Sequence, residues 1–304
     1  MAIPITHPEG TYMGIFEKKA DKDRQTFIDR CIEFDTPRLE NETYPDGVSI
    51  LSDIVYDNMT GKSGLLDIYF PGEIQDRFDE IFFLIHGGAF VYGDKLLDKN
   101  YGMHLALKSG IPVANVNYTL MPDTDLAGQA ADLVRALSFL NKEYGVSRIH
   151  TTGDSAGAYL ALLSALLCND PVIREELNIT TDPEIKCLSA NLICGGYAHD
   201  SKLFPGIYMG KDLPWHYFDL TKAMTKSFAR TGNIPVSNIT GDKDTMLREC
   251  NYFKRACDKA GIANSYYKAV STDDRVMHHV FPIAHPEWPE SVKVIDMFVK
   301  NSGH

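Results

Sequence analysis

The sequence lacks the features that would place the chain on nucleic acid, in a membrane or on a secretory route. It has no block of Lys or Arg, and its net charge of −11 disfavours nucleic acid and anionic membrane surfaces as partners. Its longest apolar run, around Leu160 to Leu167, is too short for stable membrane insertion. The N-terminal residues contain neither a basic nor an apolar segment, so we expect no signal peptide and a cytoplasmic location.

The six cysteines also lack any spacing typical of a metal site or a redox pair. There is no Cys-x-x-Cys and no Cys/His cluster, so we expect free thiols, as in a reducing cytosol. We expect no metal ion and no organic cofactor. The cysteines are scattered at Cys31, Cys168, Cys187, Cys194, Cys250 and Cys257.

Strands and helices alternate along most of the chain, whose 304 residues suit one large α/β domain. Continuous apolar runs such as residues 81–85 are typical of strands buried on both faces of a parallel sheet. The alternation predicts a mostly parallel sheet with helices on both faces. Strands are predicted at residues 49–57, 65–70, 81–85, 112–117, 148–152, 188–193, 234–240 and 265–269. Helices are predicted at residues 97–108, 127–144, 158–167, 246–260 and 289–300.

Two segments fall outside this alternation. Residues 1–45 are mixed and polar, with a helix predicted at residues 18–34 that ends before Pro37. Residues 195–226 are rich in aromatic side chains and too long for a simple loop, which predicts a mostly helical insertion.

The stretch Gly153-Asp154-Ser155-Ala156-Gly157 lies between a β-branched segment and a helical segment without breakers. Strand, tight glycine turn and helix are the context of a nucleophile elbow, which exposes a serine hydroxyl at the carboxyl end of a sheet. The two glycines leave room for the strand and the helix to come close. We predict that Ser155 is a nucleophile with a strained backbone. The alternative is an ordinary serine in a tight turn.

A nucleophilic serine needs a base to take its proton and an acid to hold that base. In this kind of fold the expected chain order is Ser, then Asp or Glu, then His. Asp244 follows the strand at residues 234–240 and is the predicted acid, with Asp242 as the alternative. His279 follows the next strand and is the predicted base, with His278 as the alternative. One of the two aspartates is expected to serve as a turn or cap residue.

The stretch His86-Gly87-Gly88-Ala89-Phe90 directly follows the buried strand at residues 81–85. Paired glycines let consecutive N–H groups turn toward one point, because no Cβ blocks the conformation. The N–H of Ala156, at the start of the helix, points at the same space. These groups are therefore candidate donors to an oxyanion, and a plain strand-end turn is the alternative for the glycines.

Three motifs together resemble the hormone-sensitive lipase-like family of α/β-hydrolase carboxylesterases. They are residues 86–90, the stretch Tyr118-Thr119-Leu120-Met121-Pro122-Asp123, and residues 153–157. Asp244 and His279-Val280-Phe281 fall where that family keeps its acid and its base. The resemblance covers most of the chain from about residue 48. The chain departs from the family pattern in the residues that follow Tyr118, Asp244 and His279. None of these departures removes a catalytic group.

The resemblance implies an α/β-hydrolase fold with a mostly parallel eight-stranded sheet. It implies an oxyanion hole formed by the N–H groups of Gly87, Gly88 and Ala156. It also implies a small helical cap, made of residues 1–45 and an insertion at about 195–226, over a catalytic domain of residues 46–304.

The function predicted from these residues is that of a serine carboxylesterase acting on short- to medium-chain carboxylic esters. Ser155, His279 and Asp244 would form the triad, and an acyl-enzyme would be the intermediate. The predicted partner is a small-molecule ester, and the edge strands of a parallel sheet leave a homo-oligomer open. Two other functions fit the same motifs: an amidase or formamidase using the same triad, and a non-catalytic, receptor-like ligand-binding member of the fold.

Overall fold

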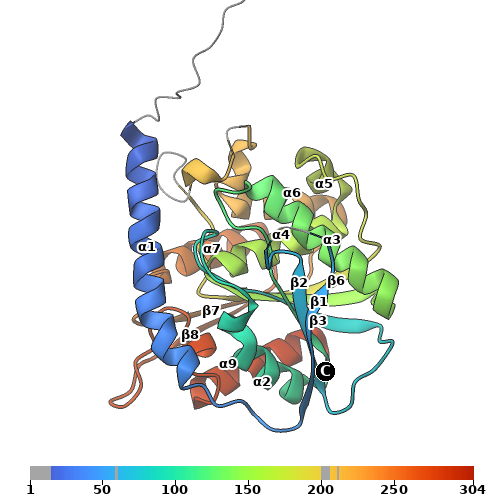
Figure 1. Ribbon diagram of the computed structural model, residues 1–304. Helices are drawn as coiled ribbons and strands as arrows, with labels where there is room; N and C mark the ends of the chain where they lie inside the picture. The colour runs from blue at the N-terminus through green and yellow to red at the C-terminus, as the bar shows by residue number, and fades with distance from the viewer. Residues whose placement is uncertain (1–14, 59–60, 200–205, 211) are drawn as a thin grey trace, which may run out of the picture.

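The computed structural model describes residues 15–58, 61–199, 206–210 and 212–304. Within this part of the chain, eight strands form one sheet in the order β1-β2-β4-β3-β5-β6-β7-β8 (Figure 1). The strands are β1 (Val48–Val55), β2 (Leu65–Pro71), β3 (Glu80–Ile85), β4 (Val113–Val116), β5 (Arg148–Asp154), β6 (Lys186–Ile193), β7 (Val236–Gly241) and β8 (Asn264–Ala269).

The sheet is mostly parallel, as predicted. Strands β3 to β8 pair in parallel, while β2 runs antiparallel to both β1 and β4. Every residue of β7, and of β3 from Ile81 to Ile85, is buried, which explains the continuous apolar run of β3. The carboxyl ends of β3, β5, β6 and β7 therefore lie side by side at one edge of the sheet, where functional groups gather in open α/β sheets.

Helices cover both faces of the sheet, and each layer has its own core (Figure 1). One face is covered by α3 (Leu126–Tyr144), α4 (Ala156–Asn169), α6 (Leu220–Thr231) and α7 (Leu247–Ala260). The other is covered by α2 (Lys99–Ser109), the short α8 (Phe281–Ala284) and α9 (Pro289–Ser302). Helix α4 is buried from Ala156 to Cys168, because it is apolar all round and lies at the centre of its layer. The predicted fold class is confirmed.

The first described helix is longer than predicted. Helix α1 spans Ile15–Glu40 and contains Pro37, although that proline was expected to end the helical pattern. Arg38 holds the last turn together: its guanidinium donates to the carboxylates of Asp35 and Glu42 and to the carbonyl oxygen of Leu97. These contacts offset the hydrogen bond that a proline removes from a helix.

The segment at 195–226 is less helical than predicted. Its described part contains two short 3₁₀ turns, Gly206–Tyr208 and Trp215–Tyr217, before α6 begins at Leu220. The remaining predicted residues, 200–205 and 211, lie outside the described part of the chain. A short helix that was not predicted, α5 (Pro171–Glu176), follows α4.

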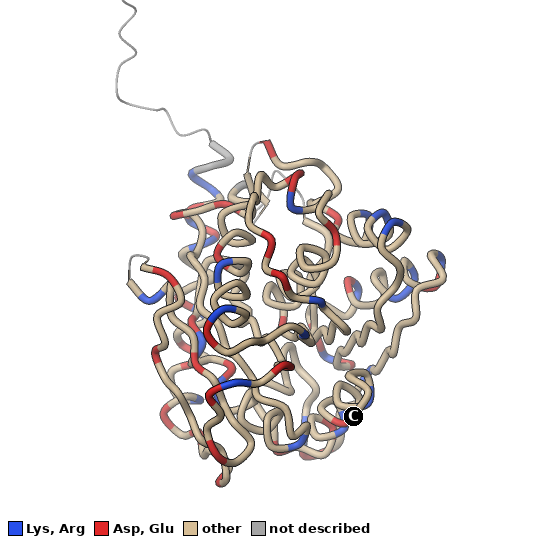
Figure 2. The backbone as a smooth tube through the Cα atoms, turned by 90° about the vertical axis from the view of Figure 1, so that its right-hand side faces the viewer, with Lys and Arg blue, Asp and Glu red and all other residues tan. Residues whose placement is uncertain are grey.

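Charged residues of both signs are distributed along the described chain, as the coloured backbone in Figure 2 shows. The six cysteines are free thiols, as predicted. Among the described residues, no helix has the length and apolar character required to cross a membrane.

Candidate active site

Ser155 occupies the turn between β5 and α4 with φ 52° and ψ −116°, a conformation that strains any residue other than glycine. Its N–H donates to the carbonyl oxygen of Ile193 on β6, over 2.8 Å. The turn is tight enough to require both glycines. A Cβ at Gly157 would lie 2.0 Å from the carbonyl oxygen of Ile85, and one at Gly153 would lie 2.5 Å from the same atom.

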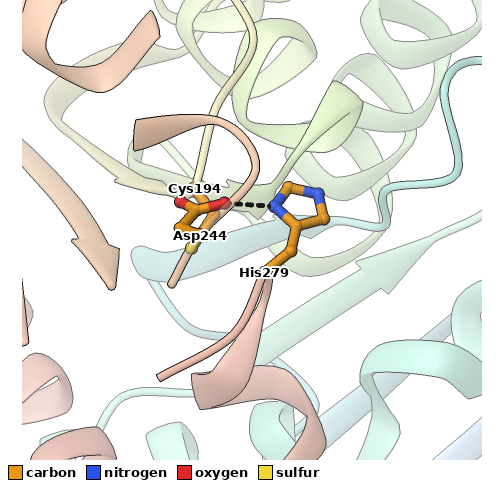
Figure 3. A group of neighbouring side chains, drawn as sticks. All are labelled: Cys194, Asp244 and His279. Carbon is orange, nitrogen blue, oxygen red and sulfur yellow. Dashed lines mark hydrogen bonds and ion pairs between the residues drawn. The ribbon is translucent and has the colours of Figure 1, made fainter. Parts of the chain in front are cut away.

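Ser155, His279 and Asp244 form a continuous chain of hydrogen bonds. The Nε2 atom of His279 lies 2.9 Å from the Ser155 hydroxyl oxygen, and its Nδ1 atom lies 2.7 Å from a carboxylate oxygen of Asp244. Figure 3 shows the second contact, with the imidazole and the carboxylate facing one another. The structure thus brings together the three residues predicted as nucleophile, base and acid.

The Asp244 carboxylate is fully buried and held from several sides. Besides His279, it accepts hydrogen bonds from the Thr240 hydroxyl at 2.6 Å and the Met246 N–H at 2.8 Å. Burial raises the pKa of Asp244, but the hydrogen bond and charge of His279, with the two further donors, outweigh it and leave the pKa below its usual range. Asp244 is therefore ionised at neutral pH and oriented toward His279.

The alternative acid and base lie elsewhere. Asp242 accepts hydrogen bonds from the N–H and hydroxyl of Ser271 and serves as a turn residue. The side chain of His278 is exposed, and its backbone N–H donates to the Val276 carbonyl oxygen. Neither contacts Ser155 in the hydrogen bonds of the described residues.

One predicted oxyanion donor is wrong. The N–H of Gly87 donates to the Asp154 carboxylate over 2.8 Å, so it is not free for a substrate oxygen. Within the described chain, the N–H groups of Gly88, Ala89 and Ala156 have no protein acceptor. Gly88 and Ala89 have positive φ values of 103° and 50°, which turn the loop after β3 back on itself. The donor set that fits the geometry is therefore Gly88, Ala89 and Ala156.

Two buried acids that the sequence did not single out support this loop. Asp154, directly before the nucleophile, also accepts a hydrogen bond from the Asp98 carboxyl group. Burial and then the charge of Asp154 raise the pKa of Asp98 well above its usual range, which favours the protonated form of Asp98. His86 is also neutral, because burial lowers its pKa to about 4. Its ring stacks on that of Tyr118, with 4.5 Å between the ring centres.

Helix α1 and the 3₁₀ turn at Gly206–Tyr208 lie against one another beside this loop. The Tyr208 hydroxyl donates to the Asp21 carboxylate, and the Arg24 guanidinium lies 5.9 Å from the centre of the Tyr208 ring. Further along α1, Asp35 accepts a hydrogen bond from the hydroxyl of Tyr92, which follows the oxyanion loop. Helix α1 is thus anchored both at the 3₁₀ turn and beside the loop.

The described residues contain one group with the ligand types and spacing for a metal ion, Cys194, Asp244 and His279. Asp244 and His279 are already hydrogen-bonded to one another, and His279 also contacts Ser155.

A separate cleft of about 670 Å³ lies at the amino-terminal ends of β6 and β7, and its lining contains neither a histidine nor a triad residue. We therefore place the candidate active site at Ser155.

Comparison with known proteins agrees with the fold. A family model described as BD-FAE matches residues 66–200, which include both the oxyanion loop and the nucleophile elbow. The chain is similar to an inhibited esterase B from Lactobacillus rhamnosis, with 22% identity and a TM-score of 0.81 over 94% of this chain and 97% of that one.

Two more distant structures come from a fungus and an archaeon. An esterase of Rhizomucor miehei aligns with a TM-score of 0.67 and 17% identity, covering 99% of this chain and 98% of that chain. A hyperthermophilic esterase of Pyrobaculum calidifontis aligns with a TM-score of 0.65 and 18% identity, covering 94% of this chain and 95% of that chain. These structural matches confirm the predicted α/β-hydrolase fold.

Proposed function

We propose that this α/β-hydrolase, which resembles the hormone-sensitive lipase-like carboxylesterases, is a serine carboxylesterase acting on short- to medium-chain carboxylic esters. The observation that carries the proposal is the unbroken chain of hydrogen bonds from the Ser155 hydroxyl through His279 to the buried Asp244 carboxylate. Such a chain converts a weakly nucleophilic hydroxyl into an attacking group.

In the proposed reaction, Nε2 of His279 takes the proton of Ser155 as the serine oxygen attacks the ester carbonyl carbon. The carbonyl oxygen becomes an oxyanion and accepts hydrogen bonds from the N–H groups of Gly88, Ala89 and Ala156. Collapse of this intermediate breaks the bond to the alcohol, which leaves with the proton from His279. A water molecule, deprotonated in turn by His279, then releases the acid and regenerates Ser155.

Asp244 acts through His279 in this scheme. Its carboxylate holds the imidazole with Nε2 toward the serine and stabilises the positive charge that appears when His279 takes the proton. Its hydrogen bonds to Thr240 and Met246 keep the carboxylate from rotating away.

We also propose that α1 and the segment from the 3₁₀ turn at Gly206–Tyr208 to the start of α6 form the cover of this site. The hydrogen bond between Asp21 and Tyr208 joins these two parts, and that between Asp35 and Tyr92 joins α1 to the oxyanion loop. A cover held in this way favours small or medium soluble esters over lipid surfaces.

Hydrolysis of p-nitrophenyl esters from acetate to palmitate tests the proposed function. We expect the wild type to hydrolyse short esters, and Ser155→Ala and His279→Ala to lose this activity. His278→Ala is the matched control for His279→Ala, because His278 is adjacent and exposed. A folded wild type that is inert toward all these esters but cleaves an aryl amide or formamide would make it an amidase. Inertness toward all of them, with no labelling of Ser155 by a fluorophosphonate probe, would favour a receptor-like protein.

A further inference from the structure

Cys194 directly follows β6, which lies between the strand that carries the nucleophile and the strand that precedes the acid. Ile193 accepts the hydrogen bond from the N–H of Ser155, and the N–H of Cys194 donates to Ile239 of β7, both over 2.8 Å. This strand end therefore bonds to both neighbouring strands at the edge where the candidate site lies.

The backbone of Cys194 has a positive φ of 51°, which is uncommon for a residue other than glycine. Such a conformation persists where the surrounding structure enforces it, often at functional sites. Glycine would avoid the strain. The presence of a cysteine at this strained position therefore indicates a role for its sulfur atom.

The sulfur of Cys194 is buried directly beside the acid and base (Figure 3). The sulfur, a carboxylate oxygen of Asp244 and a ring nitrogen of His279 all lie within 4.8 Å of one another. The Asp244 side chain and the backbone of Val280 both lie close enough to the thiol to act on its pKa. Val280 directly follows the proposed base and has a left-handed backbone with φ 54°. One sulfur atom thus contacts both the acid loop and the base loop.

The Asp244 carboxylate has an acceptor position left over for a hydrogen bond from this thiol. A carboxylate offers about four acceptor positions. His279, Met246 and Thr240 account for three of them. Burial, and then the negative charge of Asp244, raise the pKa of the Cys194 thiol well above its usual range. The group is therefore a protonated S–H donor, which completes the set around the carboxylate.

We propose that Cys194 is a positioning residue for the reaction: its buried thiol donates to Asp244 and accepts from the Val280 N–H, and so holds the acid and the base in register with Ser155. This inference rests on the proposed function, because it assigns Cys194 to the geometry of that same triad. Cys194 touches no substrate in this role, because its side chain is completely buried.

The test compares Cys194→Ala and Cys194→Ser with Cys187→Ala. Cys187 is also buried, lies near the other end of the same strand and donates its thiol to the Ser189 carbonyl oxygen. We expect Cys194→Ala to lower kcat for a short p-nitrophenyl ester about tenfold, with KM unchanged, as for loss of one hydrogen bond to a charged group. Cys194→Ser keeps a donor, and we expect it to retain kcat within about threefold. Cys187→Ala should keep the wild-type kcat.

The proposal is overturned if Cys194→Ala keeps the wild-type kcat, if Cys187→Ala loses as much, or if Cys194→Ser loses as much as the alanine variant. Should Cys194→Ala not fold, Cys194→Gly removes the same thiol and adopts the observed positive φ without strain.

A second measurement separates this inference from the proposed function. The proton on Nδ1 of His279, shared with Asp244, is expected to give a low-field proton NMR resonance in the folded protein without any substrate. If the wild type hydrolyses no ester, the proposed function fails, and this resonance still tests the role of Cys194. We expect it to shift or broaden in Cys194→Ala and to stay unchanged in Cys187→Ala. An identical resonance in all three proteins would overturn the inference.

Discussion

The N–H of Gly87 and the carboxylate of Asp154 are joined by a 2.8 Å hydrogen bond. It ties the loop after β3 to the residue immediately before the nucleophile. The two parts of the candidate site that must face one substrate carbonyl, the oxyanion donors and Ser155, are thus fixed to each other. A Cβ on Gly87 would lie 2.5 Å from the Asp154 carboxylate, so this contact also requires glycine.

Removal of this acceptor should loosen the oxyanion loop. Hydrogen bonds to charged groups contribute about 1.5–3 kcal/mol, so we expect Asp154→Ala to lower kcat/KM by about 10- to 100-fold. Asp154→Asn keeps an acceptor oxygen for Gly87 and should lose less. Steady-state hydrolysis of p-nitrophenyl butyrate by the two variants measures the difference. Equal activity of both variants and the wild type would show that the loop is held by other contacts.

Asp98 should make the stability of the protein fall as pH rises. Its pKa in the folded state is raised by burial and by the charge of Asp154. The folded state therefore keeps a proton that the unfolded state releases above about pH 4, and each increase in pH favours unfolding until Asp98 itself ionises. Asp98→Asn has no proton to lose, and its amide can still donate to Asp154.

The difference in melting temperature between Asp98→Asn and the wild type should therefore move in favour of the variant as the pH rises above about 4. Thermal unfolding followed by circular dichroism at several pH values measures it. A constant difference over this range would mean that Asp98 does not retain a raised pKa in the folded protein.

The two neighbouring aspartates in the loop after β7 should differ sharply in their effect on activity. Asp244→Asn replaces the carboxylate with an amide that cannot stabilise a charged imidazole, and we expect a loss in kcat on the order of 10⁴-fold. Asp242→Asn should stay close to the wild type, because Asp242 bonds to Ser271 and not to His279. The same ester assay on both variants decides the assignment, and a comparable loss in both would contradict it.

Asp244 and His279 could be predicted from the sequence, because the chain order and the strand ends restrict the candidate acids and bases to two short loops. Gly87 shows where such reasoning stops. Two adjacent glycines look alike in sequence, and which N–H is free depends on Asp154, 67 positions away along the chain. Cys194 gave no signal at all, because only the strand order places β6 between the nucleophile and the acid.

Pro37 illustrates the same limit in the fold. Local propensity ends a helix before a proline, whereas the tertiary hydrogen bond from Arg38 to the carbonyl oxygen of Leu97 helps α1 continue to Glu40. The alternation of strands and helices, by contrast, follows directly from apolar periodicity, and the sheet and both helical layers could be predicted from it.

The central helix α4 should be the part of the fold that tolerates truncation least. Leu162 is completely buried in the core between the sheet and the helical layer, so Leu162→Ala should lower the free energy of unfolding by about 2–5 kcal/mol. Leu107 on α2 is 37% exposed, and Leu107→Ala is the matched control with a smaller expected loss. Urea unfolding of both variants gives the comparison, and equal losses would contradict the central place of α4.

The proposed cover should restrict long substrates through the contact between α1 and the 3₁₀ turn at Gly206–Tyr208. Asp21→Ala removes the acceptor of the Tyr208 hydroxyl, and a looser cover should admit longer acyl chains more easily. We expect the ratio of kcat/KM for the octanoate ester to that for the acetate ester to rise by about threefold to tenfold, since the contact is a single hydrogen bond to a charged group near the surface. Asp29→Ala is the control, because the Asp29 carboxylate accepts from Gln25 on the exposed side of the same helix. If both variants keep the wild-type ratio, α1 does not restrict the acyl side of the site, and chain-length preference must be set by side chains below it.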